Sequence, residues 1–212
     1  MNQLLYVEGK DYYFIGALCR KHYPIPKGVS ETKGSFLKGG GGYEQTLDKF
    51  IEAFNTPELT NIALIVDADF GKIEGRFAEI IAALSKRLNL DLSKYTLNTE
   101  GVTIVENGLP TIGIWIMPDN VNNGYLEYFV EQLIEETDEI LPVVKLTIDD
   151  LMKEKYCRFT DFKKQKAMIY TWLAWQETPG LPFGTALEAK YLNHNKEYLK
   201  PFLNWIGKTF QF

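Results

Sequence analysis

Cysteine and histidine are both scarce in this chain. It contains only two cysteines, Cys19 and Cys157, and two histidines, His22 and His194. The cysteines lack the close spacing of zinc ligands, and two histidines are too few for a histidine-rich zinc site. We therefore expect no structural zinc centre, and a reduced chain located in the cytoplasm.

Long apolar runs are also missing. The longest falls far short of the roughly 20 residues that span a bilayer. The opening Met1-Asn2-Gln3 has no basic region followed by an apolar stretch, so no signal peptide is expected. A chain of 212 residues, 45% apolar and 24% charged, is typical of a soluble globular protein without membrane contact.

The net charge of −5 argues against a general nucleic-acid coat protein. Its distribution is uneven, because an acidic stretch over residues 127–150 is followed by a basic stretch over residues 153–166. A basic segment in an acidic protein can contact a phosphate backbone, although it is more often a solvated helix face. The basic side chains are Lys153, Lys155, Arg158, Lys163, Lys164 and Lys166.

Short apolar runs alternate with helical spacing through the first two thirds of the chain. Asn107-Gly108 is a strong hairpin signal, so its flanking runs form either an antiparallel edge pair or an edge arm leading into the fourth parallel strand. The tail from Leu146 has helical spacing throughout. Strands are predicted over residues 4–7, 29–37, 62–66, 101–105 and 111–117, and helices over 11–22, 43–54, 73–90, 124–137, 148–156, 161–177, 185–192 and 197–210.

This alternation predicts an α/β fold with a Rossmann-like parallel sheet of about four strands, covered by helices on both faces. We expect an α/β domain over residues 1–140. A C-terminal helical extension over residues 141–212 should pack on it.

Carboxylates follow two of the predicted parallel strands. Glu8 comes directly after the first, and Asp67 and Asp69 follow the apolar run that ends at Val66. Ligands of open α/β sheets bind beyond the carboxyl ends of the strands, and Mg²⁺ prefers carboxylate, water and phosphate oxygens. The pattern favours a magnesium site over the alternative, in which Glu8 is a turn residue and the two aspartates cap the next helix.

The chain resembles the toprim domain at these residues. The resemblance lies in an apolar strand ending in Glu8-Gly9-Lys10-Asp11, a glycine turn, and a second apolar strand ending in Asp67-Ala68-Asp69. Toprim domains occur in topoisomerases, bacterial primases, recombination-repair proteins and OLD-type nucleases. The similarity covers about residues 3–135 and is closest to the OLD-type nucleases and small uncharacterised bacterial proteins related to them.

The resemblance implies roles for particular residues. The matching Glu8 would bind metal or act as general acid or base, and Asp67 and Asp69 would hold Mg²⁺ or Mn²⁺. OLD-type domains carry a Gly-x-Leu-Glu-like element whose glutamate serves the metal site, which here is Glu127. A lysine beyond the toprim core matches best to Lys166.

Alternatives remain open at several positions. Glu127 could instead be a first-turn glutamate stabilised by its helix dipole, and Asp119 could take its place because it also ends a strand. The glycine run 39–42 is a weak phosphate-loop signal without the Gly-Lys-Ser or Gly-Lys-Thr of a Walker A motif. Near the acidic ends, Lys10, Lys72 and Arg76 could meet a phosphate.

Aromatic side chains in the tail invite two interpretations. Trp172, Trp175, Trp205 and Tyr170 could stack on unpaired bases. The helical spacing that places Trp172 beside Ile169 and Leu173 favours core packing instead.

The predicted function is Mg²⁺- or Mn²⁺-dependent phosphoryl transfer on nucleic acid, most simply by a toprim- and OLD-like nuclease. The alternative is a non-catalytic module that binds metal together with a nucleotide or nucleic acid. A receiver-like phosphoacceptor fits less well, because the first strand ends in Glu-Gly rather than paired aspartates. Since OLD-type nucleases normally carry an ATPase domain, the resemblance also suggests a separate ATPase or defence-system chain as partner.

Overall fold

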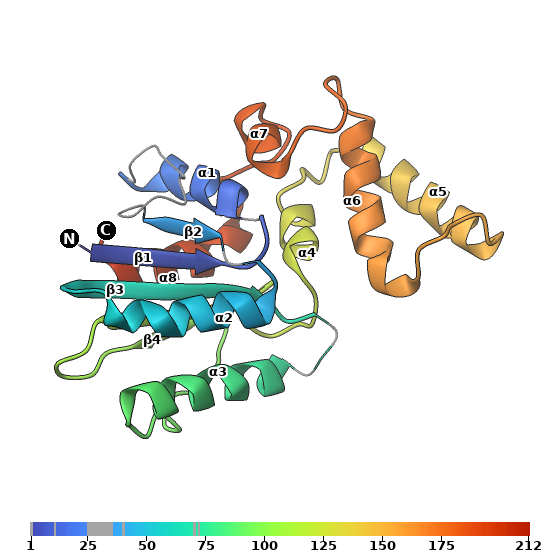
Figure 1. The fold of residues 1–212 in the computed structure, drawn as a ribbon. Helices are drawn as coiled ribbons and strands as arrows, with labels where there is room; N and C mark the ends of the chain where they lie inside the picture. Colours follow the sequence, from blue (N-terminus) through green and yellow to red (C-terminus); the bar gives the residue numbers. More distant parts are fainter. Residues whose placement is uncertain (1, 11, 25–35, 40, 70, 72) are drawn as a thin grey trace.

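A five-stranded sheet lies at the centre of the computed structural model, which describes residues 2–10, 12–24, 36–39, 41–69, 71 and 73–212. The strand order is β2-β1-β3-β5-β4 (Figure 1). The first four of these run parallel, and β4 pairs antiparallel with β5 at the edge. The strands are β1 (Asn2–Val7), β2 (Leu37–Gly39), β3 (Leu59–Asp67), β4 (Val102–Ile104) and β5 (Thr111–Met117).

The predicted α/β fold with a mainly parallel sheet is confirmed, and it is compatible with a Rossmann-like arrangement. Of the two arrangements expected around Asn107-Gly108, the structure has the edge arm: β4 pairs antiparallel with β5, with Val102 opposite Ile114, and β5 is the fourth parallel strand. The predicted second strand over residues 29–37 lies mostly outside the described residues, and the described strand begins at Leu37.

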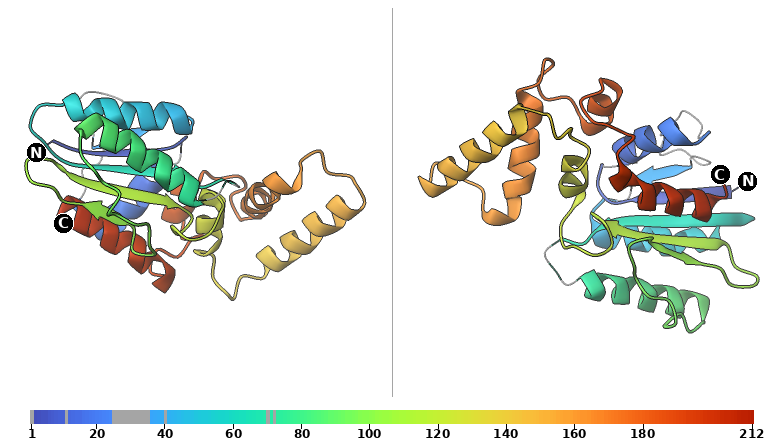
Figure 2. Two further views of the ribbon diagram at one scale, coloured as in Figure 1. Left: turned by 90° about the horizontal axis from the view of Figure 1, so that it is seen from below. Right: turned by 180° about the vertical axis from the view of Figure 1, so that it is seen from behind.

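Alternating side chains of the strands feed two separate cores, as the two-residue period of a strand requires. Leu4 and Tyr6 point to one core, and Leu5 and Val7 to the other. The first face is covered by α2 (Tyr43–Glu52) and α3 (Ile73–Leu88), and the second by α1 (Tyr12–His22) and α8 (Lys200–Phe210), as Figure 2 shows. A 3₁₀ turn over Ala53–Asn55 follows α2.

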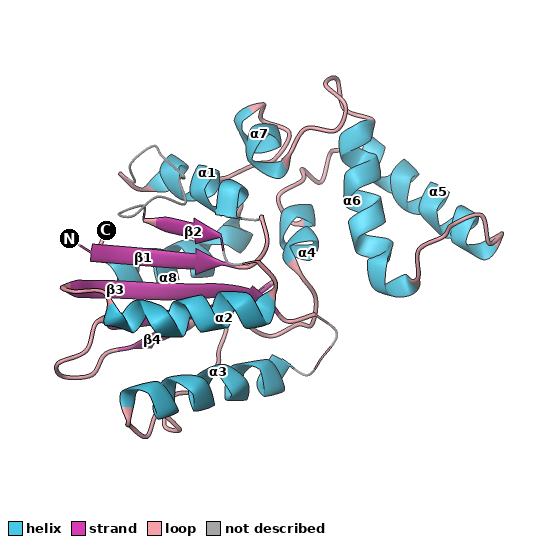
Figure 3. Cartoon of the chain, in the orientation of Figure 1, coloured by secondary structure: helices cyan, strands magenta, loops and turns pink. Residues whose placement is uncertain are grey.

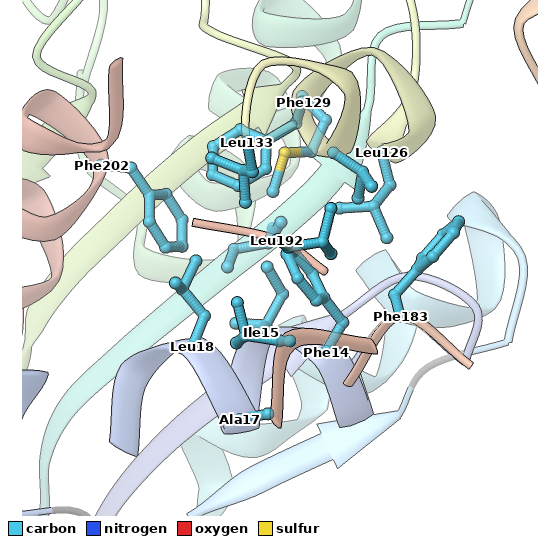
Figure 4. Close-up of a cluster of buried hydrophobic side chains, with 14 of the residues drawn as sticks. Phe14, Ile15, Ala17, Leu18, Leu126, Phe129, Leu133, Phe183, Leu192 and Phe202 are labelled. Atoms are coloured by element: carbon cyan, nitrogen blue, oxygen red, sulfur yellow. The ribbon is translucent and has the colours of Figure 1, made fainter. Parts of the chain in front are cut away.

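The remaining helices lie towards the carboxyl ends of the parallel strands (Figure 3). They are α4 (Leu126–Glu131), α5 (Ile140–Lys153), α6 (Lys164–Ala174) and α7 (Phe183–Glu188). α4 is anchored to the sheet because Leu126 and Phe129 are buried against Phe14 and Ile15 of α1 (Figure 4). α6 lies beyond α4 on the side of the carboxyl ends of the strands, and α5 lies farther out still (Figure 1).

Several predicted helices begin or end at other residues in the structure. The helix predicted over residues 124–137 spans only Leu126–Glu131, because Gly124 bridges to Asp69 and Tyr125 is extended with φ of −149°. The helix predicted from residue 148 begins earlier, at Ile140, because Asp138 Oδ1 accepts the backbone N–H groups of its first turn. The helices predicted from residues 161 and 197 begin with 3₁₀ turns, Asp161–Lys163 and Glu197–Leu199.

The last helix of the chain, α8, packs closely against one face of the sheet. Trp205 of α8 is buried and donates its indole N–H to Val102 O at 3.0 Å, and Asn61 donates to Thr209 O at 2.8 Å. Gly113 of β5 makes this approach possible, since a Cβ there would lie 2.7 Å from Thr209 Cγ2 and 3.0 Å from Trp205. A residue without a Cβ is therefore required at this crossing.

We expect Gly113→Ala to lower the free energy of unfolding by roughly 1–3 kcal/mol, the usual cost of overpacking a core. Gly75→Ala is the matched control, because a Cβ at Gly75 meets nothing within 4 Å and alanine is the better helix former. Urea denaturation of both variants measures the difference. An unchanged midpoint for Gly113→Ala would contradict the close packing of α8 on β5.

A histidine pair joins the end of α1 to the turn before α8. The His22 and His194 rings meet edge to face with centroids 5.3 Å apart, and His22 Nε2 lies 2.9 Å from His194 O. Burial, followed by the charges of His22 and Lys21, lowers the pKa of His194 below its ordinary value, while Glu188 opposes the shift. The neutral form is therefore the one that the fold favours.

The pKa of His194 is lower in the folded state than its ordinary value of 6.5, so the unfolded chain takes up a proton first as the pH falls. The stability that neutral His194 contributes is therefore complete above pH 6.5 and is lost as the pH falls towards the folded-state pKa. We expect the melting temperature of the wild type to fall more between pH 8 and pH 5 than that of His194→Gln, which cannot titrate. Parallel curves for the two proteins would show that this pair does not couple to folding.

Candidate functional site

Glu8 and Asp67 lie side by side at the carboxyl end of the sheet. β1 and β3 are parallel neighbours, with Val7 in register with Ile65. Glu8 donates its backbone N–H to Ile65 O at 3.0 Å, and its side-chain Oε2 accepts the backbone N–H of Asp67 at 3.1 Å. Glu8 and Asp67 are therefore neighbours at the carboxyl end of the sheet, and their sharing of a metal ion stays a prediction.

Asp67 also reaches α4. Its Oδ1 accepts the backbone N–H of Leu126 at 3.1 Å, which fixes the start of α4 against the end of β3. Asp69 and Gly124 exchange backbone hydrogen bonds of 2.8 and 2.7 Å. These contacts bring the Asp67-Ala68-Asp69 element and the Gly124-Tyr125-Leu126-Glu127 element together.

Backbone conformation at this junction requires particular residues. Gly124 has φ of +143°, and a Cβ there would lie 2.7 Å from the ring of Tyr128. Asp69 has φ of +54°, a left-handed conformation that aspartate tolerates better than most residues. The glycine of the Gly-x-Leu-Glu-like element is thus needed for the strand end to meet α4.

Three of the predicted carboxylates and the predicted lysine border one cleft of about 160 Å³. Glu8 does not line this cleft but borders a separate narrow gap, together with Asp67 and the apolar ends of β1 and β3. Asp67 borders both spaces and links them. The cleft is lined by Asp67, Asp69, Tyr125, Glu127, Phe162, Lys163 and Lys166.

Basic side chains compensate the acidic ones. Arg76 Nη2 lies 3.0 Å from Asp69 Oδ2, and its guanidinium stacks over the Tyr43 ring at 3.6 Å. Lys166 Nζ lies 3.2 Å from Oε1 of Glu127, whose side chain is only 7% exposed. The predicted proximity of Arg76 and Lys166 to the acidic residues is therefore present.

The environment of Glu8 disfavours its charge. Burial is the main reason that the pKa of Glu8 is raised, and the nearby charge of Asp69 adds to it. The backbone N–H groups of Asp67 and Tyr43 and the charge of Arg76 oppose this shift. Burial, with a smaller contribution from the charge of Asp69, therefore favours the neutral form of Glu8.

Over the described ranges, no three His, Cys, Asp or Glu side chains are already gathered into a group that could hold a metal ion. Glu8, Asp67, Asp69 and Glu127 lie in adjoining spaces, but Arg76, Lys166 and backbone N–H groups engage them. The four-carboxylate metal set therefore stays a prediction.

Other predicted residues lie elsewhere. Asp119 closes its own turn by accepting the N–H groups of Val121 and Asn122 at 3.1 and 2.8 Å, and it does not line the cleft. The glycine run contacts the first acidic turn through Gly9 N–H, which donates to Gly41 O at 2.6 Å. Gly40 and Lys72 lie outside the described residues.

Tyr125 and Phe162 were not predicted as site residues, and Lys163 was predicted only as one of the basic side chains that could contact a phosphate backbone. Tyr125 donates its hydroxyl to Phe162 O at 2.7 Å, and this contact brings the start of α6 over the cleft. The basic stretch is divided between two places, because Lys163 and Lys166 line the cleft while Lys164 pairs with Asp149 on α5 at 2.5 Å. Its contact with a phosphate backbone stays a prediction. Its position in the basic stretch was the only available signal for Lys163.

The aromatic residues of the tail divide into two groups. Trp172 and Trp205 are buried, as the packing interpretation predicted, and Trp172 donates its indole N–H to Asp138 at 3.1 Å. Trp175 and Tyr170 are 45% and 51% exposed. Core packing therefore explains the two buried tryptophans but not the exposed Trp175 and Tyr170.

Comparison with known proteins identifies a family whose description names no function. The family model described as "Protein of unknown function (DUF3226)" matches residues 2–211. The chain belongs to this family. No curated protein and no solved structure matches this DUF3226 chain. In the part of the chain that the structure describes, none of the helices has both the length and the apolar character needed to cross a membrane.

Removing the charge of Lys166 should expose the cost of burying Glu127. We expect Lys166→Met to lower the free energy of unfolding by about 1 kcal/mol, less than for a fully buried pair because the lysine is 55% exposed. Adding Glu127→Gln should restore most of the loss, since the buried charge is then gone. Equal effects of the single and double variants in denaturant titrations would show that the pair is not coupled.

Proposed function

We propose that this protein is a Mg²⁺- or Mn²⁺-dependent phosphoryl-transfer protein that acts on nucleic acid, most simply a toprim- and OLD-like nuclease. The observation that carries the proposal is the cleft in which carboxylates from β3 and α4 face two lysines of one basic segment. Oxygen ligands suit a hard divalent cation, and lysines suit phosphate. The two types in one cleft match the chemistry of a phosphodiester substrate.

Asp67, Asp69 and Glu127, together with Glu8 in the gap that borders Asp67, are the residues that would hold the metal. The cation would activate water and stabilise the leaving oxygen of a phosphodiester. The donor set fits a hard divalent ion in its chemistry, because all four side chains are carboxylates and three of them line one cleft. A bound ion would compete with Arg76 and Lys166 for Asp69 and Glu127.

The basic residues have a separate task. Lys163 and Lys166 border the cleft on its α6 side and would attract and position a phosphate group that an acidic cleft alone would repel. Arg76, on α3, already orients Asp69. We therefore assign phosphate binding to the two lysines and positioning of a metal ligand to Arg76.

The second candidate is a non-catalytic module that binds metal together with a nucleotide or nucleic acid. The ion pairs of Asp69 with Arg76 and of Glu127 with Lys166 favour it, because they satisfy two of the proposed ligands within the chain. In either case an ATPase or defence-system chain is the partner that the toprim resemblance suggests, and a cytoplasmic location fits both.

Metal binding tests the proposal directly. We expect Mg²⁺ or Mn²⁺ to raise the melting temperature, because an ion that binds only the folded state stabilises it by about 2.7 kcal/mol at 100 times its Kd. Asp67→Asn should abolish the rise and leave the metal-free protein equally or more stable. Asp119→Asn is the control, because Asp119 ends its strand outside the cleft and asparagine keeps the Oδ1 acceptor of its turn.

Labelled single- and double-stranded DNA and RNA, incubated with the protein and either metal, then separate the two candidates. Cleavage that Asp67→Asn abolishes supports the nuclease. Metal-dependent binding without cleavage selects the binding module. The absence of any Mg²⁺ or Mn²⁺ binding at millimolar concentration in calorimetry would overturn the metal site itself.

A further inference from the structure

A second cavity, of about 750 Å³, lies outside the acidic cleft and between α1, α6 and α7. Its volume is in the range of ligand sites, roughly 300–1,000 Å³. We call it the aromatic groove and define it by Lys10, Tyr13, Arg20, Tyr170, Phe183 and Glu188 among its lining residues.

Two tyrosines of the aromatic groove are held from one side and half-exposed on the other. Tyr13 is 54% exposed and packs on Tyr12, with ring centroids 4.1 Å apart. Tyr170 is 51% exposed and packs on Phe183, with centroids 5.5 Å apart. Rings fixed in this way lose little conformational entropy when a flat ligand stacks on them.

The charges in the aromatic groove favour an anion. Among the described residues, neither Lys10 nor Arg20 has an acidic side chain within ion-pair distance, which is 4.0 Å. Glu188 is the acidic residue of the lining, and it pairs with Lys21 at 2.6 Å. Two cations beside two aromatic faces are the combination that recognises alternating phosphates and bases.

The aromatic groove adjoins the acidic cleft. Lys10, which lines the groove, follows Glu8 by two residues in the sequence. On the other side, Lys166 Nζ lies 3.2 Å from Glu127 Oε1 in the cleft and 5.8 Å from the ring centroid of Tyr170 in the groove. One lysine thus contacts both the metal-site glutamate and the groove tyrosine.

We propose that the aromatic groove binds an unpaired segment of nucleic acid and leads it to the acidic cleft. Bases stack on Tyr13 and Tyr170, and Lys10 and Arg20 pair with the phosphates between them. A duplex cannot use these tyrosines, because its bases already stack on one another. The proposal rests on the proposed function and narrows its substrate to single strands, or to single-stranded ends and flaps.

The test is fluorescence anisotropy of labelled dT12 in EDTA, where metal plays no part. We expect the full-length Tyr13→Ala/Tyr170→Ala variant to bind at least tenfold more weakly, because each stacked base contributes measurably to affinity. Tyr13→Phe/Tyr170→Phe keeps both rings and should bind as the wild type does. Tyr156→Ala is the surface control, since Tyr156 is 77% exposed and does not line the groove.

Two further experiments vary the charge of the groove and compare single-stranded with double-stranded DNA. Lys10→Ala/Arg20→Ala should reduce the log–log salt slope by about 1.4, the value for two phosphates of a single strand. A 12-base-pair duplex should bind at least tenfold more weakly than dT12. Labelled rU12 tells RNA from DNA, and a preference for either is compatible with the groove.

Failure of this inference is distinguishable from failure of the proposed function. Asp67→Asn should abolish cleavage in Mg²⁺ and leave dT12 affinity in EDTA unchanged or higher, because it removes a negative charge outside the groove. Unchanged affinity in the Tyr13→Ala/Tyr170→Ala variant, or equal binding of duplex and dT12, would overturn the groove even if cleavage occurs. Tyrosine-dependent dT12 binding without cleavage would support the groove and reject the nuclease.

Discussion

The parallel pairing of β1 with β3 is the interaction on which the candidate site depends. It places Glu8 beside Asp67, which lies almost sixty positions further along the chain. The backbone N–H of Asp67 then donates a hydrogen bond to the side chain of Glu8. The burial of Leu5, Val7 and Ile65 in the core under α1 keeps the two strands in register. A slip of one residue would turn these apolar side chains outward, so the hydrophobic core enforces the position of the carboxylates.

α4 converts two acidic strand ends into a cleft. Asp67 accepts the backbone N–H of Leu126 in the first turn of α4. Asp69 pairs with Gly124, just before α4 begins. Leu126 and Phe129 bury the other side of α4 against α1. These contacts fix the start of α4, and in this position Glu127 faces Lys166.

The acidic side chains around the cleft are paired with basic side chains from distant parts of the sequence. Arg76 from α3 and Lys166 from α6 offset Asp69 and Glu127, while burial and Asp69 raise the pKa of Glu8. The protein is acidic overall, yet both spaces at this end of the molecule contain cations. Such an arrangement can admit a phosphate group where the net charge of the chain would otherwise repel it.

The sequence by itself determined the α/β class, the mainly parallel sheet and the placement of Glu8 and Asp67 after strands, because apolar periodicity and strand-end carboxylates are local patterns. It misplaced α4 and the start of α5, where the bridge from Asp69 to Gly124 and the capping by Asp138 decided the outcome. It did not identify Lys163 as a cleft residue or Tyr13 as part of a groove. Only the tertiary structure decided these positions, since they depend on how α6 and α7 pack over α4 and α1, and side-chain contacts between distant segments leave no periodic signal in a single sequence.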